Sequence, residues 1–194
     1  MKHFNIVIVG LGPTGGTLGN LLAMHGLSIL IIEKEKSSYQ LPRAVHFDDE
    51  VMRVFDTIGI ASRLRKKIII NKGTRFIDRE GKTVLDWPRP KKITENGWYP
   101  SYRFHQPDLE RLLYKQLRSF KKVKIIRNSS VVKITEKVGY VEVEFICSEV
   151  GISKFVKADY LVGCDGSNSV TRESAELKLD NLGFSQRWAV TDLI

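Results

Sequence analysis

Three glycines near the N-terminus have the spacing of a turn that holds a diphosphate. Gly10, Gly12 and Gly15 give the pattern G-x-G-x-x-G directly after the β-branched run Ile6–Val9, which is typical of a strand covered on both faces by helices. The first glycine permits a tight turn, the second lets backbone approach a pyrophosphate, and the third lets a helix pack against the strand. Unpaired N–H groups at the helix start favour the phosphates. The alternative is a glycine turn that only joins strand to helix.

An acidic residue follows the glycines at the distance expected for ribose binding. Ser28–Ile32 is a second apolar run, and Glu33 comes directly after it. A carboxylate at the end of the second strand accepts hydrogen bonds from a pair of ribose hydroxyls and disfavours a 2′-phosphate. The pattern therefore fits FAD or NAD better than NADP. The alternative is that Glu33 is an ordinary solvated carboxylate in a charged stretch of sequence.

Three further polar residues are candidates for the same ligand. Arg43 lies in a proline-containing loop, where its guanidinium could neutralise a pyrophosphate or remain solvated. Gln106 stands at the start of a predicted helix, and its amide could cap that helix, which the sequence favours, or point at a ligand. Asp165 and Gly166 follow the apolar run from Tyr160, and doubly wound sheets bind ligands at such strand ends. A structural turn that caps a helix is the alternative there.

Composition limits the classes of function. The chain has 194 residues, 42% hydrophobic content and a formal net charge of +9. No apolar run has the length of a membrane span and no signal-peptide pattern is present, so a cytoplasmic location is expected. Lys and Arg occur as short scattered pairs, which does not favour nucleic-acid binding. Cys147 and Cys164 lie in apolar runs and are expected in the core, while His46 and His105 lack partners at catalytic or metal-ligand spacing. No catalytic residue and no metal site are therefore assigned.

The remaining elements follow from periodicity and turn residues. An amphipathic helix is predicted over Glu50–Leu64, with an interruption at Gly59, and a second helix begins at Gln106. The sequence also predicts a hairpin from Thr74–Asp78 and Lys82–Asp86, a strand over Val123–Ile126, a meander of Val131–Thr135, Tyr140–Ile146 and Lys154–Val156, a separate strand from Tyr160, a helix after Asp165, and a last strand over Trp188–Leu193.

Together these motifs resemble the flavin-dependent aromatic hydroxylases of the para-hydroxybenzoate hydroxylase type, also called class A flavoprotein monooxygenases. The resemblance rests on the glycine motif with Glu33, on Leu41–Ala44, on His105–Leu109, and on Cys164–Gly166 followed by Ser169 and Arg172. Pro42–Ala44 and Gln186–Trp188 resemble the 3-(3-hydroxyphenyl)propionate hydroxylase branch.

The resemblance implies a cofactor and the residues that hold it. The glycine motif and Glu33 would hold the ADP half of FAD, Arg43 and Gln106 would contact its pyrophosphate and ribityl region, and the main chain near Val131 would meet the adenine. Asp165 would belong to a motif linked to both FAD and NAD(P)H. The full set of expected cofactor-binding residues is Gly10, Gly12, Pro13, Thr14, Gly15, Glu33, Lys34, Arg43, Gln106, Val131, Asp165 and Gly166.

The resemblance also implies a fold and an activity. We expect an α/β, FAD/NAD(P)-binding Rossmann-like three-layer domain with an incomplete β-rich substrate portion. Residues 1–72 and 101–176 would form the FAD-binding domain, 73–100 an excursion into the substrate domain, and 177–194 the start of a truncated substrate domain. The later Gly-Asp motif of such enzymes does not follow, so the chain resembles the N-terminal part of one, as a truncated product or excised fragment.

The expected function is the FAD-binding portion of an NAD(P)H-dependent monooxygenase that hydroxylates small phenolic or aromatic substrates. This portion is not expected to turn over alone, because the flavin ring would be left exposed to water. The alternatives are a flavin-dependent reductase or dehydrogenase of the same fold, and a non-catalytic nucleotide-binding remnant.

Overall fold

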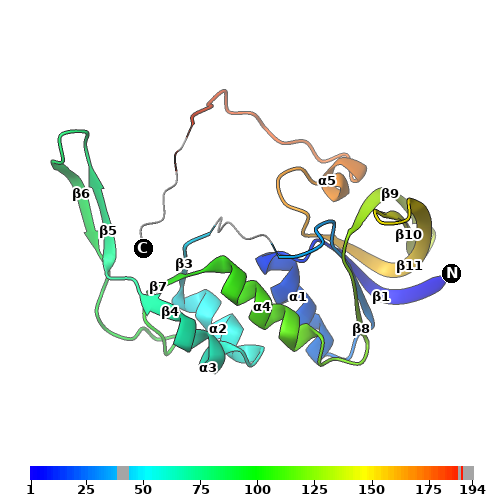
Figure 1. Cartoon of the computed structure of the whole chain (residues 1–194), viewed down its shortest axis with the longest axis horizontal. Coiled ribbons are helices and arrows are strands. Elements are labelled where there is room, and N and C mark those ends of the chain that lie inside the picture. The colour runs from blue at the N-terminus through cyan, green and yellow to red at the C-terminus, as the bar shows by residue number, and fades with distance from the viewer. Residues whose placement is uncertain (39–43, 188, 190–194) are drawn as a thin grey trace.

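A six-stranded sheet lies at the right of the molecule in Figure 1, beside helices α1 (Pro13–Met24) and α4 (Gln106–Leu117). The computed structural model describes residues 1–38, 44–187 and 189. Four neighbouring strands of the sheet are parallel, and the last two are antiparallel to the strand beside them. In spatial order the strands are β8 (Val123–Ile126), β2 (Ile29–Ile32), β1 (Lys2–Val9), β11 (Ile152–Gly163), β10 (Tyr140–Cys147) and β9 (Ser129–Lys137).

Strand β1 is buried on both faces, as its run of β-branched residues predicts, but helices cover only one of them. Ile6 and Ile8 pack with side chains of helices α1 and α4. The other face, with Val7 and Val9, packs against side chains of β9, β10 and β11. The expectation of helices on both faces was wrong, because the β9–β10–β11 meander supplies the second apolar cover. The three layers are therefore helix, sheet and meander.

Strand β11 is one continuous strand where the sequence predicts two. Its first half pairs with β10 in antiparallel fashion, and its second half pairs with β1 in parallel fashion. Residues 157–159, which lie between the two predicted strands, belong to β11, and the polar side chains among them have partners. Lys157 lies over the Tyr140 ring at 4.2 Å, and Asp159 accepts hydrogen bonds from His3 and Asn5 at 2.6 and 3.0 Å. Polar side chains on an exposed face thus leave the strand intact.

A second, three-stranded sheet consists of β3 (His46–Asp48), β7 (Ser101–Phe104) and β4 (Ile68–Ile70), with β7 in the middle. One face packs on α2 (Asp49–Thr57) and α3 (Ala61–Leu64), which is followed by the 3-10 turn η1 (Arg65–Lys67). The predicted helix over Glu50–Leu64 is divided at Gly59, whose φ of 77° favours glycine.

The hairpin predicted from alternation is present as β5 (Gly73–Ile77) and β6 (Thr83–Pro88), and it projects from the body of the molecule (Figure 1). Large apolar side chains on it are exposed, among them Phe76, Val84 and Trp87. A short helix, α5 (Val170–Ser174), follows β11. Trp188 and residues 190–194, where the last strand is expected, lie outside the described residues. Within the part of the chain that is described, no helix has the length and hydropathy needed to cross a bilayer.

Candidate functional site

The ends of three parallel strands bring the sequence-predicted residues together. Val9 pairs with Ile32 of β2 on one side and with Gly163 of β11 on the other. Backbone hydrogen bonds continue past the strands, because Gly10 N donates to the Ile32 carbonyl at 2.8 Å and Cys164 N donates to the Val9 carbonyl at 2.7 Å. The glycine turn, Glu33 and Asp165 therefore leave the sheet at one edge, where the carboxyl ends of the three parallel strands meet.

The three motif glycines have different surroundings. A Cβ on Gly10, whose φ is 100°, would lie 2.3 Å from the Cys164 carbonyl oxygen, and a Cβ on Gly15 would lie 2.1 Å from the Gly10 carbonyl oxygen. No heavy atom lies within 4 Å of a Cβ built on Gly12. Gly10 and Gly15 are therefore required by the protein's own packing, whereas Gly12 faces open space into which a ligand could come.

Helix α1 begins at this turn without a side-chain cap. Gly12 is the N-cap residue, Pro13 is the first helical residue, and no acidic side chain lies in the first turn. Thr14 is exposed. The backbone N–H groups of the first helical turn and the positive end of the helix dipole are thus available to an anion beside Gly12.

The Glu33 carboxylate points at the glycine turn. One of its oxygens, Oε2, accepts a hydrogen bond from Leu11 N at 2.6 Å, and the other, Oε1, accepts one from Glu35 N at 2.8 Å. A carboxylate offers about four lone-pair positions, so each oxygen retains one for a further donor. Two hydroxyl groups of a ribose fit that remaining capacity. Lys34, the next residue, is exposed at the same strand end.

Ser129 is a residue of this site that sequence reasoning missed. Its backbone N–H donates to the Glu33 carbonyl at 3.0 Å, and the residue is 1% exposed. The bond places the start of β9 beside the Glu33 backbone, at the end of β2. The tight turn before it, with Asn128 at φ 53°, is the one local signal, since asparagine tolerates this conformation better than most residues.

Asp165 has structural partners in α5. Its Oδ1 accepts from the Ser169 hydroxyl at 2.6 Å, and its Oδ2 accepts from Thr171 N at 3.1 Å and from the Thr171 hydroxyl at 3.2 Å. Burial alone would raise the pKa of Asp165, but these hydrogen bonds outweigh it and hold the pKa below its usual value. The following Gly166 has a φ of 80° and is exposed, so it lets the backbone turn outward from the strand end.

Gln106 does not cap α4 with its side chain, contrary to the favoured expectation. The N-cap residue is His105, which makes no side-chain capping bond. The Gln106 side chain is buried, and its Oε1 accepts from Ala44 N at 3.0 Å while its Nε2 donates to Glu110 Oε1 at 2.8 Å. Gln106 thus ties the segment after Arg43 to α4, a partner that only the tertiary fold supplies. Arg43 itself lies outside the described residues.

The described part of the chain holds no cluster of three or more His, Cys, Asp and Glu side chains that could bind a metal ion. Cys147 and Cys164 are free thiols and only half-buried. Burial and the neighbouring Asp165 raise the pKa of the Cys164 thiol, which keeps it protonated and unreactive.

Comparison with known proteins agrees with this geometry. Residues 3–194 match the family described as FAD binding domain. The chain is 34% identical over 193 residues to a probable NADH-specific resorcinol 4-hydroxylase of Rhodococcus jostii (strain RHA1), which covers 98% of the chain and 36% of the relative. It is 33% identical to a 3-(3-hydroxy-phenyl)propionate/3-hydroxycinnamic acid hydroxylase of Mycolicibacterium gilvum (strain PYR-GCK), over 97% of the chain and 32% of the relative.

Solved structures share the fold. The p-nitrophenol 4-monooxygenase of Pseudomonas putida DLL-E4 superposes with a TM-score of 0.84 at 21% identity, over 93% of this chain and 45% of that one. The flavin-dependent monooxygenase PieE, solved with FAD and substrate, gives a TM-score of 0.83 at 21% identity, over 92% of this chain and 33% of that one.

The chain spans about a third of the length of the curated relatives it matches. Within that third, the glycine turn and the acidic strand end stand where a dinucleotide fold requires them. The resemblance to the flavin-dependent aromatic hydroxylases is confirmed, and the chain belongs to the FAD binding domain family.

Proposed function

We propose that this chain binds FAD at the strand ends and forms the flavin-binding part of an NAD(P)H-dependent monooxygenase, an oxidoreductase that acts on small phenolic substrates. The observation that carries the proposal is the Glu33 carboxylate, which accepts a hydrogen bond from Leu11 N beside the unobstructed Gly12. A carboxylate in that position is matched to ribose hydroxyls, and an open glycine at a helix start is matched to a diphosphate.

Each end of the ADP moiety would have its own partners. The pyrophosphate would take the backbone N–H groups at the start of α1, around Pro13, Thr14 and Gly15. The adenosine ribose would take Glu33, and the adenine would lie against the main chain near Val131. We also propose Lys34, Arg43, Gln106, Asp165 and Gly166 as contacts of the cofactor.

When bound, the flavin supplies two-electron redox chemistry with reduced nicotinamide and O2, which no side chain can supply. The residues of this chain bind and orient the cofactor, and we assign none of them as a catalytic acid or base. Because the chain corresponds to a third of its relatives, we propose that it does not hydroxylate a phenol unaided. A cytoplasmic location is part of the same proposal, and nucleic acid is not among the proposed partners.

Titration with FAD tests the proposal directly. The purified chain should quench flavin fluorescence saturably, and Glu33→Gln should weaken binding roughly tenfold through loss of a charge-assisted hydrogen bond. Glu35→Gln is the matched control, because it removes an equal charge two residues away while leaving the backbone bond from Glu35 N in place. Absence of saturable FAD binding by the folded chain, or an equal effect of both substitutions, would contradict the assignment.

A further inference from the structure

Helix α4 carries a buried carboxylate, Glu110, in its first half. Glu110 is 8% exposed, and Gln106, one helical turn before it, is 6% exposed. The two side chains lie on one helix face, where Gln106 Nε2 donates to Glu110 Oε1 at 2.8 Å. Acidic side chains are rarely buried unless a partner compensates them. The partner here is the Gln106 amide, since no Lys, Arg or His of residues 1–38 and 44–187 forms an ion pair with Glu110.

The two ends of the Gln106 amide meet groups of opposite kind. Its Oε1 accepts a hydrogen bond from Ala44 N at 3.0 Å, while its Nε2 faces Glu110. A backbone N–H can only donate, and an ionised carboxylate can only accept. The reversed amide would place its NH2 group against the Ala44 N–H and its oxygen against the carboxylate, which gives two repulsive contacts. Ala44 and Glu110 therefore select the same orientation of Gln106.

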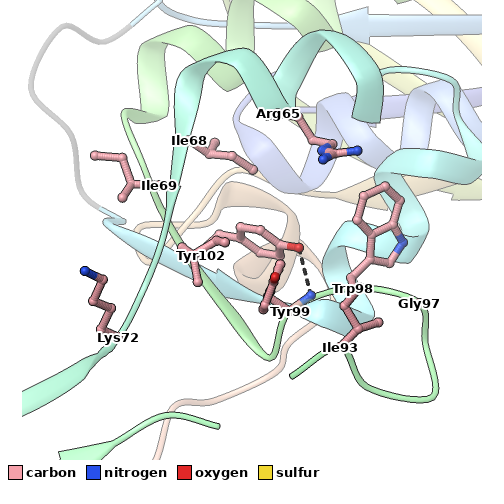
Figure 2. Close-up of a pocket in the computed structure, with 10 residues that line it drawn as sticks. Arg65, Ile68, Ile69, Lys72, Ile93, Gly97, Trp98, Tyr99 and Tyr102 are labelled. Carbon is pink, nitrogen blue, oxygen red and sulfur yellow. Dashed lines mark hydrogen bonds between the residues drawn. The ribbon is translucent and has the colours of Figure 1, made fainter. Parts of the chain in front are cut away.

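The strand that leads into α4 is firmly anchored. Tyr102 of β7 is 5% exposed and packs on Phe47 with ring centroids 5.5 Å apart. Its hydroxyl accepts a hydrogen bond from Tyr99 N at 2.9 Å, the dashed line in Figure 2. The first turn of α4 follows this strand directly, so Gln106 starts from a fixed point of the fold.

The Gln106 side chain extends this anchoring to a neighbouring segment. Phe104 N donates to the Val45 carbonyl at 3.1 Å, next to the pairing of β3 with β7. Ala44, one residue further from the sheet, is bound by the Gln106 side chain instead of by a strand. The orientation of one amide therefore decides whether the Ala44 N–H has an acceptor at this place.

Helix α4 runs beside α1 in the same direction (Figure 1). A Cβ on Gly16 would lie 3.3 Å from Leu113 Cβ, and one turn later a Cβ on Gly19 would lie 3.1 Å from Leu117 Cδ2. One turn back along both helices, the same register brings Glu110 toward the start of α1. The first turn of α4 is thus at the end of the helix pair where the glycine turn lies.

We infer that Glu110 is a positioning residue of the candidate site. It fixes the orientation of the Gln106 amide and, through it, holds the Ala44 N–H. The consequence for FAD rests on the proposed function, in which Gln106 is a contact of the cofactor. An amide that is already oriented has less freedom to lose when a ligand binds. Glu110 acts through Gln106 and needs no contact with the cofactor itself.

Hydrogen exchange at the Ala44 amide, followed by NMR on the whole chain without FAD, measures this role. Glu110→Leu removes the acceptor at similar volume and should speed exchange at Ala44 roughly two- to tenfold, the range of one net hydrogen bond. Glu136→Gln is the matched control, because it removes an equal charge from an exposed position of β9 and should leave exchange at Ala44 unchanged.

Exchanging the two residues separates hydrogen bonding from packing. Gln106→Glu alone brings two carboxylates together and should remove the protection of Ala44. In the double variant Gln106→Glu/Glu110→Gln, the amide now at position 110 can donate to the carboxylate at position 106, whose other oxygen can accept from Ala44 N. Exchange at Ala44 should return to within about twofold of the unsubstituted chain. A role in packing alone predicts no such rescue.

Titration with FAD measures the consequence for the cofactor, and Glu110→Leu should weaken binding roughly two- to tenfold. Three results would overturn the inference: unchanged exchange at Ala44 in folded Glu110→Leu, no rescue in the folded double variant, or unchanged FAD affinity in Glu110→Leu when the unsubstituted chain binds FAD. Circular dichroism checks each fold, and the double variant decides if Glu110→Leu does not fold. If the unsubstituted chain does not bind FAD, the proposed function fails, while the exchange measurements still decide the role of Glu110.

Discussion

Alanine substitutions at Gly12 and Gly15 separate the requirements of the ligand from those of the fold. The two glycines are three residues apart at the same helix start, yet a Cβ on Gly15 would lie 2.1 Å from the Gly10 carbonyl oxygen and one on Gly12 would meet nothing within 4 Å. We therefore expect Gly15→Ala to destabilise the protein, and Gly12→Ala to leave stability nearly unchanged while weakening FAD binding.

The magnitudes follow from the contacts. Pressing a methyl group against a backbone carbonyl costs about 3 kcal/mol, at the upper end for overpacking, and alanine regains about 1 kcal/mol of helix propensity over glycine. The net loss for Gly15→Ala is about 2 kcal/mol, or roughly 4–8 °C in Tm for a chain of this length. At Gly12 a methyl group would push a diphosphate away from the helix start. Loss of one or two charge-assisted bonds there corresponds to roughly 10–100-fold weaker binding.

Thermal unfolding without ligand measures the first effect, and FAD fluorescence titration measures the second. If Gly12→Ala binds FAD as tightly as the unsubstituted chain, the open space at Gly12 has no role in binding. If Gly15→Ala melts at the same temperature as the unsubstituted chain, the close approach at the turn is absent in solution. Either result would contradict the roles given to these two glycines.

Two further predictions concern carboxylates whose pKa is lowered. Burial raises the pKa of Asp165, but hydrogen bonds from Ser169 and Thr171 outweigh it, so the pKa is lower in the folded protein than in the unfolded chain. The ionised Asp165 carboxylate therefore stabilises the fold above its ordinary pKa of about 3.9. That stabilisation is lost as the pH falls through the lower pKa of the folded state. Asp165→Asn should therefore lower Tm more at pH 6 than at pH 2; an equal effect at both values would contradict this. Hydrogen bonds from Thr94 and then Asn96 lower the pKa of Asp49. Asp49→Ala removes both bonds and should lower Tm by about 2–4 °C; an unchanged Tm would show that the loop containing Thr94 and Asn96 needs no anchor.

Local patterns were sufficient to predict that the glycine motif and the acidic strand end lie together, because the whole signal lies within one strand, one turn and the next strand. The fold places Gly10, Gly12, Gly15 and Glu33 at adjacent strand ends. Their role in nucleotide binding stays a prediction. The hairpin could also be predicted from local signals, namely two runs of alternating apolar and polar residues separated by a glycine turn. Its assignment to a substrate domain stays a prediction.

Features that depend on distant partners could not be predicted. Gln106 accepts from Ala44, which is 62 residues away, so its choice between a cap and a tertiary bond is made only on folding. The same holds for Ser129 and the Glu33 carbonyl. The continuity of β11 through Lys157 and Asp159 could not be predicted either, because a sequence pattern does not say which face of a strand will meet solvent.

Strand β11 is the last strand in the described part of the chain, yet it pairs along nearly the full length of the first. During synthesis on the ribosome, β1 therefore has one unpaired edge until Ile152–Gly163 has emerged. Pairings so distant along the chain are slow to form, and the exposed edge can pair with other molecules in the meantime. Premature termination before β11 would leave the glycine turn without the Cys164 carbonyl against which Gly10 packs.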